Sequence, residues 1–257
     1  MRLEKLFSKE ALAFMPYICC GDPSEEFTIR LAETLVSNGA DAIELGIPFS
    51  DPIADGKTIQ GASSRALENG MSPAKAVGLI ARIREKTEVP ICVMTYYNIV
   101  FGTRNFVKSI KDAGADGLIV PDLPIEESGE LEAECRKHGI GLIYFITPGS
   151  SDKRLEEISK KCSGFLYAVS VAGISGSRKS VPEEALELVR RMKTISSVPL
   201  VVGFGISRPE HAEAYAEAGA NGVIVGSHIV ELYSGLQEEE ALQNVADFTR
   251  RMKHRYK

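Results

Sequence analysis

The chain has 257 residues, of which 44% are hydrophobic, and its formal net charge is −5. That apolar fraction is ordinary for a globular protein and supplies enough side chains for a large core. The 30 basic and 35 acidic side chains give no electrostatic footprint for nucleic acid or for anionic lipid, so we expect neither partner.

The N-terminal segment 1–14, "MRLEKLFSKEALAF", is charged and helical in pattern. It lacks the apolar core of a signal peptide, and it has no span of about 20 apolar residues. We therefore predict an N-terminal helix and a soluble, cytoplasmic protein. The cysteines are odd in number and show no C-x-x-C spacing, which favours a reducing compartment. They are Cys19, Cys20, Cys92, Cys135 and Cys162.

The histidines are scattered along the chain. None forms H-E-x-x-H or pairs with a nearby cysteine, so the sequence predicts no metal site. They are His138, His211, His228 and His254.

Short apolar runs recur along the chain and are separated by polar, amphipathic stretches. They are continuously hydrophobic rather than alternating, which is typical of strands buried on both faces of a parallel sheet. The eight runs are 17–20, 42–45, 91–95, 117–120, 142–146, 165–169, 200–203 and 222–226.

The stretches between the runs read as helices. Segment 24–39 opens with a serine cap and closes on Asn-Gly, and segments 125–139 and 208–219 also end on glycine. The similar stretches "NGADAIEL", "AGADGLIV" and "AGANGVIV" indicate one supersecondary unit used repeatedly. We predict an α/β fold: a (β/α)8 TIM barrel, one domain over 1–257, with an extra N-terminal helix. A doubly wound open sheet is the alternative.

An acid interrupts the second run. Glu44 lies two residues before Gly46, and burying an unpaired carboxylate is costly. The eight runs contain no Lys or Arg that could pair with it. Barrel chemistry lies at the C-terminal strand ends, so we favour a functional carboxylate over a satisfied core acid. Desolvation would raise its pKa and suit it to general acid and base work near neutral pH.

The loop "SDPIADGKTIQ" follows this strand and carries two more acids, Asp51 and Asp55. Aspartate in a Pro/Gly loop usually makes a turn. This loop, however, begins where the strand of Glu44 ends, and it can fold over the same pocket. Two carboxylates in different environments can divide proton-transfer roles. Spacing does not choose between Asp51 and Asp55.

Glycine clusters follow the last three runs, namely "GISGS" (173–177), "GFGIS" (203–207) and "GVIVGSHIV" (222–230). Barrels of this kind frequently bind phosphate with the loops after strands 7 and 8. We expect a substrate with a phosphate at one end and reacting bonds near Glu44. No strand-end lysine is available for a Schiff base, which argues against a class I aldolase mechanism. No P-loop is present, and "GFGISR" lacks the third glycine of a dinucleotide fingerprint.

The stretch "IELGIPFSDPIADGKTIQ" resembles the signature of the tryptophan synthase alpha subunit family. The resemblance covers the whole chain and includes "GDP" (21–23), "MTYYNIVFG" (94–102), "PDLPIEES" (121–128) and "SVAGISG" (170–176). It implies a lyase barrel that cleaves indole-3-glycerol phosphate to indole and glyceraldehyde 3-phosphate. It also implies no cofactor in this chain, and an alpha2-beta2 heterotetramer in which indole passes to a beta subunit that contains pyridoxal phosphate.

The resemblance also implies roles for single residues. Glu44 would be the general acid and base, and Asp55 would interact with the indole N–H. Segment 171–182 would be a mobile lid. The implied substrate-binding residues are Tyr167, Gly176, Gly205, Gly226 and Ser227, and the implied beta-subunit contacts are Asp51 and Pro52. Cys19 stands where many members have Thr, and Pro121 where some have Ala, so the apolar pocket is expected to differ in detail.

Two alternatives remain beside this reading. The first is a stand-alone indole-3-glycerol phosphate lyase with no partner. The second is a non-catalytic barrel that binds phosphate ligands and regulates a partner. The presence of both Glu44 and Asp55 counts against the second.

Overall fold

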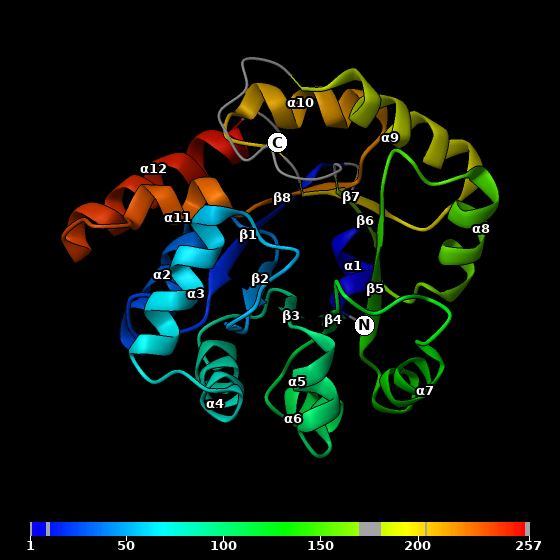
Figure 1. The fold of residues 1–257 in the computed structure, drawn as a ribbon. Helices are drawn as coiled ribbons and strands as arrows, with labels where there is room; N and C mark the ends of the chain where they lie inside the picture. The colour runs from blue at the N-terminus through cyan, green and yellow to red at the C-terminus, as the bar shows by residue number, and fades with distance from the viewer. Residues whose placement is uncertain (1, 9–10, 170–180, 204, 255–257) are drawn as a thin grey trace.

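Eight parallel strands close into a barrel, in which each strand pairs with the next along the chain and β8 pairs with β1. The computed structural model describes residues 2–8, 11–169, 181–203 and 205–254. The predicted TIM barrel is confirmed, and the open-sheet alternative is wrong (Figure 1). The strands are β1 (Ala13–Cys19), β2 (Ile43–Gly46), β3 (Ile91–Met94), β4 (Gly117–Ile119), β5 (Gly141–Ile146), β6 (Leu166–Ala168), β7 (Leu200–Val202) and β8 (Gly222–Val225).

Helices surround the strands (Figure 1). The helical segments end as their caps predict: the Ser24 side chain accepts from the Phe27 N–H at 3.1 Å, and Gly139 and Gly219 follow their helices in the left-handed conformation. The helices are α1 (Arg2–Leu6), α2 (Glu25–Ser37), α3 (Lys57–Glu68), α4 (Pro73–Arg84), α5 (Tyr97–Gly102), α6 (Phe106–Asp112), α7 (Gly129–His138), α8 (Asp152–Lys161), α9 (Glu183–Ile195), α10 (Pro209–Ala218), α11 (Ser227–Tyr233) and α12 (Glu238–His254). None of the described helices is long and apolar enough to span a membrane.

The N-terminal helix is present but shorter than its sequence pattern predicts. It covers Arg2–Leu6, and β1 already begins at Ala13. The register explains the difference. The first half of β1, up to Pro16, pairs with β8, whereas the second half pairs with β2. The first half therefore closes the barrel against a strand near the other end of the chain, and no local pattern reports that partner.

Helix α1 covers the N-terminal end of the barrel. Leu3 is 2% exposed, and its Cδ1 lies against Gly117 and Gly141, where β4 and β5 begin. Arg2 pairs with Glu88 at 3.0 Å and with Asp116 at 3.4 Å, both just before strands. Because this end is covered, the opposite end, where the strands finish, is left for a functional site.

An ion pair with a buried carboxylate ties together three connections around that opposite end. Asp22, which is 0% exposed, follows β1 and accepts from Arg65 Nε and Nη2 of α3, each at 2.8 Å. The Tyr233 hydroxyl of α11 donates to the same carboxylate at 2.8 Å. Helices α3 and α11 follow β2 and β8, so this network holds the segments after both strands in a fixed relation.

Candidate active site

Glu44 is a buried carboxylate near the C-terminal end of β2. It is 1% exposed, and the Tyr167 hydroxyl donates to its Oε2 at 3.4 Å. Among the described residues, its Oε1 has no hydrogen-bond partner and no cation forms an ion pair with it. Burial, and then the charge of Asp55, raise the pKa of Glu44 to about 8. Glu44 is therefore an acid that is protonated at neutral pH, with one oxygen left free for a ligand.

Asp55 lies on the connection between β2 and α3, close enough for its charge to act on Glu44. It is half-buried, and the Tyr96 hydroxyl donates to its Oδ2 at 3.2 Å. That hydroxyl also accepts the Ala54 N–H at 3.1 Å, so Tyr96 fixes the loop. Burial raises the pKa of Asp55 to about 6. At neutral pH the site therefore combines an ionised Asp55 with a protonated Glu44, which is the division of roles that acid–base chemistry uses.

Asp51 takes a different position from Asp55. Its side chain is exposed, and its Oδ2 accepts from the Ser50 hydroxyl at 2.6 Å. Pro52 is half-buried, and Ile53 is 83% exposed. The structure thus separates the two aspartates that spacing left equivalent. Asp55 interacts with Glu44, whereas Asp51 and Pro52 lie on the rim.

Tyr167, from β6, reaches Glu44 across the barrel. Its ring packs on Phe145 of β5 with centroids 4.7 Å apart. It also lies so close to Gly203 that a Cβ at that position would be 2.1 Å from its Cε2. Only glycine fits there, because real Cβ atoms do not approach other atoms so closely. Gly203, directly after β7, therefore leaves the space in which the Tyr167 ring lies beside Glu44.

Sequence reasoning missed two tyrosines of this site, Tyr17 and Tyr96. Tyr17 pairs in register with Glu44 on the neighbouring strand, and Tyr96 holds Asp55. A usable signal exists for both. Tyr17 opens the first apolar run, and Tyr96 comes directly after the third. A hydroxyl near the end of a barrel strand is a candidate for the mouth.

The candidate phosphate-binding residues lie after adjacent strands. Gly205 follows β7 in the left-handed conformation, with φ 63°, and its carbonyl oxygen is 3.0 Å from His211 Nδ1. Gly226 follows β8, and Ser227 begins α11. Because β7 and β8 are paired, these residues meet at one end of the barrel. Gly176 lies outside the described residues, as does the proposed lid segment 171–182 except for 181 and 182.

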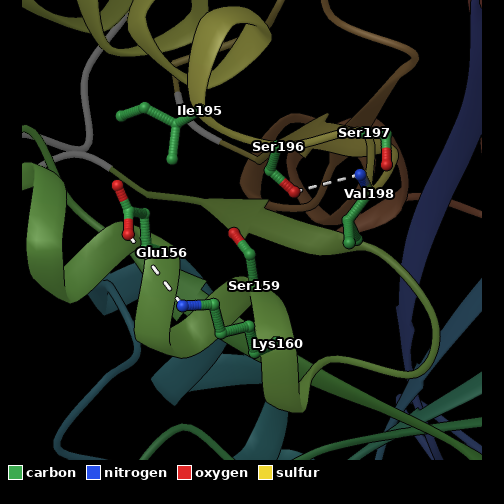
Figure 2. A pocket seen from close by; sticks show the side chains of 7 residues that line it. All are labelled: Glu156, Ser159, Lys160, Ile195, Ser196, Ser197 and Val198. Atoms are coloured by element: carbon green, nitrogen blue, oxygen red, sulfur yellow. Dashed lines mark hydrogen bonds and ion pairs between the residues drawn. The ribbon is translucent and has the colours of Figure 1, made fainter.

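Two hollows bear on where a ligand fits. One, of about 330 Å³, lies between α8 and the connection into β7, at the N-terminal strand ends (Figure 2). Its charged groups, Glu156 and Lys160, pair with each other, so it offers no unpaired charge. The other, of about 270 Å³, lies at the C-terminal strand ends and is lined by Pro121 and Phe145 among others. Since Phe145 packs on Tyr167, only this second hollow adjoins the site.

The Cys19 side chain faces a helix. Its Sγ lies 3.9 Å from the Ser63 hydroxyl of α3, and the residue is 0% exposed. Burial raises the pKa of this thiol well above its ordinary value, so it stays protonated. Cys19 therefore acts as a small core residue behind the site.

Fold and site together define a class: a (β/α)8 barrel of the enzyme type, with a buried and a half-buried carboxylate at the ends of its strands. The family model described as "Tryptophan synthase alpha chain" matches residues 3–257. The chain belongs to this family, whose members are lyases.

Named relatives agree with the family model. The tryptophan synthase alpha chain of Methanocaldococcus jannaschii is 49% identical over 234 residues, which are 90% of this chain and 83% of that one. The same chain of Halalkalibacterium halodurans is 46% identical over 241 residues, 93% and 90% of the two chains. A solved structure from Pyrococcus furiosus, of the tryptophan synthase α2β2 complex, superposes with a TM-score of 0.89 at 38% identity and covers 95% of this chain and 98% of that chain.

Proposed function

We propose that this chain is the lyase subunit of tryptophan synthase, which cleaves indole-3-glycerol phosphate to indole and glyceraldehyde 3-phosphate. The observation that carries the proposal is the buried Glu44, which is protonated at neutral pH and within reach of the charge of Asp55. Its Oε1 has no partner among the described residues. Membership of the family supports it. The family match runs from residue 3 to the last residue, and strands from both ends close the barrel, which supports one domain over 1–257.

The reaction is a retro-aldol cleavage in which the indole ring is the electron sink. Protonated Glu44 gives its proton to indole C3, and the ring nitrogen becomes positively charged. The Glu44 carboxylate then takes the proton of the hydroxyl on the adjacent side-chain carbon. The O–H electrons form the aldehyde, the carbon–carbon bond breaks, and its electrons restore the aromatic ring. Glu44 ends protonated, so no proton is consumed.

The other polar groups would support this cycle. Ionised Asp55 would stabilise the positive charge that develops at the indole nitrogen. Tyr167 holds Glu44 Oε2 and would keep the carboxyl group aimed at the substrate. Gly205, Gly226 and Ser227, with Gly176, would bind the phosphate. The ring itself stores the electrons, so this step needs no cofactor in the chain.

The rim of the barrel supports docking of a beta subunit. Ile53 is 83% exposed and Phe101 79% exposed, and they follow neighbouring strands, β2 and β3. Large apolar side chains this exposed at the ends of neighbouring strands are candidates for contact with a partner. Asp51 and Pro52 lie on the same loop as Ile53. We propose an alpha2-beta2 assembly in the cytoplasm, in which indole passes to a beta subunit that carries pyridoxal phosphate.

The test is indole release from indole-3-glycerol phosphate by the purified chain, alone and with a tryptophan synthase beta subunit. We expect slow release alone and strong acceleration by the partner. Fast release without any response to the partner would favour a stand-alone lyase and would remove the interface roles of Asp51 and Pro52. No release under either condition would favour the regulatory, non-catalytic barrel.

The rate of the reaction should depend on pH at both ends of the neutral range. Asp55 must be ionised, so kcat/KM should rise with pH through about 6. Glu44 must be protonated, so kcat/KM should fall as pH rises through about 8. The alkaline limb is the diagnostic one, since the substrate phosphate itself titrates near pH ~6. Steady-state kinetics from pH 5 to pH 10 measure this profile, and a rate that stays constant above pH 8 would contradict the role of Glu44.

A further inference from the structure

Tyr17 spans the distance between the two ends of the candidate site. At one end its hydroxyl lies against Gly46, where a Cβ would be 2.1 Å from the oxygen. At the other end its Cβ and Cδ1 lie near Gly226, 3.5 and 3.7 Å from the place of a Cβ there. Gly226 belongs to the proposed phosphate site, and Gly46 is two residues beyond Glu44 on β2.

The Tyr17 hydroxyl has no hydrogen bond to any described residue, although Tyr17 is only 6% exposed. Burial, and then the charges of Cys19, Asp55 and Glu44, raise the pKa of Tyr17 well above its ordinary value. The side chain is therefore a neutral phenol, with one proton to donate and lone pairs to accept. The hydroxyl oxygen is not among the fully buried atoms without a partner, so it keeps some accessible surface and a ligand can reach it.

The bound substrate of the proposed reaction has to lie along the Tyr17 side chain. Its phosphate would bind beside Gly226, and its reacting carbon would lie at Glu44. The three-carbon chain between them then passes the Tyr17 ring and hydroxyl. Its first hydroxyl is the one that Glu44 deprotonates. The hydroxyl on the middle carbon takes no part in bond breaking and is free to be bound.

We propose that the Tyr17 hydroxyl hydrogen-bonds the middle hydroxyl of the bound substrate and thereby positions the scissile bond over Glu44. Tyr17 is thus a substrate-contacting residue that discriminates a hydroxylated three-carbon chain from a bare one. This inference rests on the proposed function, and it adds one polar contact to the same site.

Tyr17→Phe removes this hydroxyl and keeps the ring. We expect kcat/KM for indole-3-glycerol phosphate to fall about 10-fold, the value of one hydrogen bond. The dissociation constant of 3-(indol-3-yl)propyl phosphate, which has neither side-chain hydroxyl, should stay unchanged. The matched control is Tyr144→Phe. The Tyr144 hydroxyl donates to Glu132 at 2.8 Å, away from Glu44, so its removal should alter neither quantity.

A substrate that lacks only the middle hydroxyl completes a double-mutant-type cycle of two enzymes and two substrates. The parent should process it about 10-fold more slowly than the full substrate, whereas Tyr17→Phe should treat both alike. The parent arm needs no variant, so it tests the proposal even if Tyr17→Phe folds poorly. A parent that does not distinguish the two substrates overturns the proposal. It is also overturned if Tyr17→Phe raises the dissociation constant of the propyl phosphate by the same factor by which it lowers kcat/KM for the substrate. Either result leaves the lyase function intact, because the parent still releases indole.

Discussion

Glu44→Gln is expected to lower the rate of indole release about 10³-fold or more, because one side chain supplies both the acid and the base of the proposed reaction. Glutamine keeps the shape of the side chain, and its carbonyl oxygen can still accept from Tyr167. It has no acidic proton to give to indole C3 and no carboxylate to take one back. Single-turnover release of indole, with and without a beta subunit, measures the loss.

A matched control separates chemistry from charge. Glu134→Gln removes a carboxylate that pairs with Lys137 on the last turns of α7, and it should keep the parental rate. Binding of 3-(indol-3-yl)propyl phosphate to the Glu44→Gln variant should also stay unchanged, which would show an intact pocket. If Glu44→Gln released indole as fast as the parent, the proton transfers given to Glu44 would be wrong.

The same Glu44→Gln substitution is expected to stabilise the fold at alkaline pH. The pKa of Glu44 is raised from an ordinary value of 4.5 to about 8 by burial. Between these two values the folded chain binds more protons than the unfolded chain, so the free energy of unfolding falls as pH rises. Glutamine carries no such proton. The variant should therefore exceed the parent by about 5 kcal/mol at pH 9, and by less than about 1 kcal/mol at pH 5.

Urea denaturation at pH 5, 7 and 9 measures this difference in the free energy of unfolding. The gain should grow through the window and level off above pH 8. Glu134→Gln serves again as control, because the pKa of that exposed carboxylate is lowered by Lys137 and it brings no gain that grows with pH. A gain that is the same at pH 5 and pH 9 would contradict a buried, protonated Glu44. Together the two results would show that the site keeps a destabilising acid for its chemistry.

Local residue patterns were enough to predict most strands and helices and to point to Glu44 as the candidate acid of the site. Continuous apolar runs report burial on both faces, so all eight strands of the barrel could be predicted. Serine and glycine caps are local as well, which is why α2 begins after Ser24 and why α7 and α10 end before Gly139 and Gly219, as predicted. An acid in a run without any cation is also a local fact, and it was enough to single out Glu44.

How these elements meet depends on contacts between residues that lie far apart in the chain. Apolar periodicity says that a strand is buried but not which strand pairs with it. The repeated units therefore favoured a closed barrel over an open sheet, but only the pairing of β1 with β8 shows the closure. Asp51 and Asp55 share one loop. The loop's path depends on the Tyr96 hydroxyl, which arrives from a different strand end. Tyr17 reads as one more apolar core residue until Gly46 and Gly226 are seen at its two ends. Each of these facts is a contact between residues far apart in the chain, and such contacts leave no trace in local residue patterns.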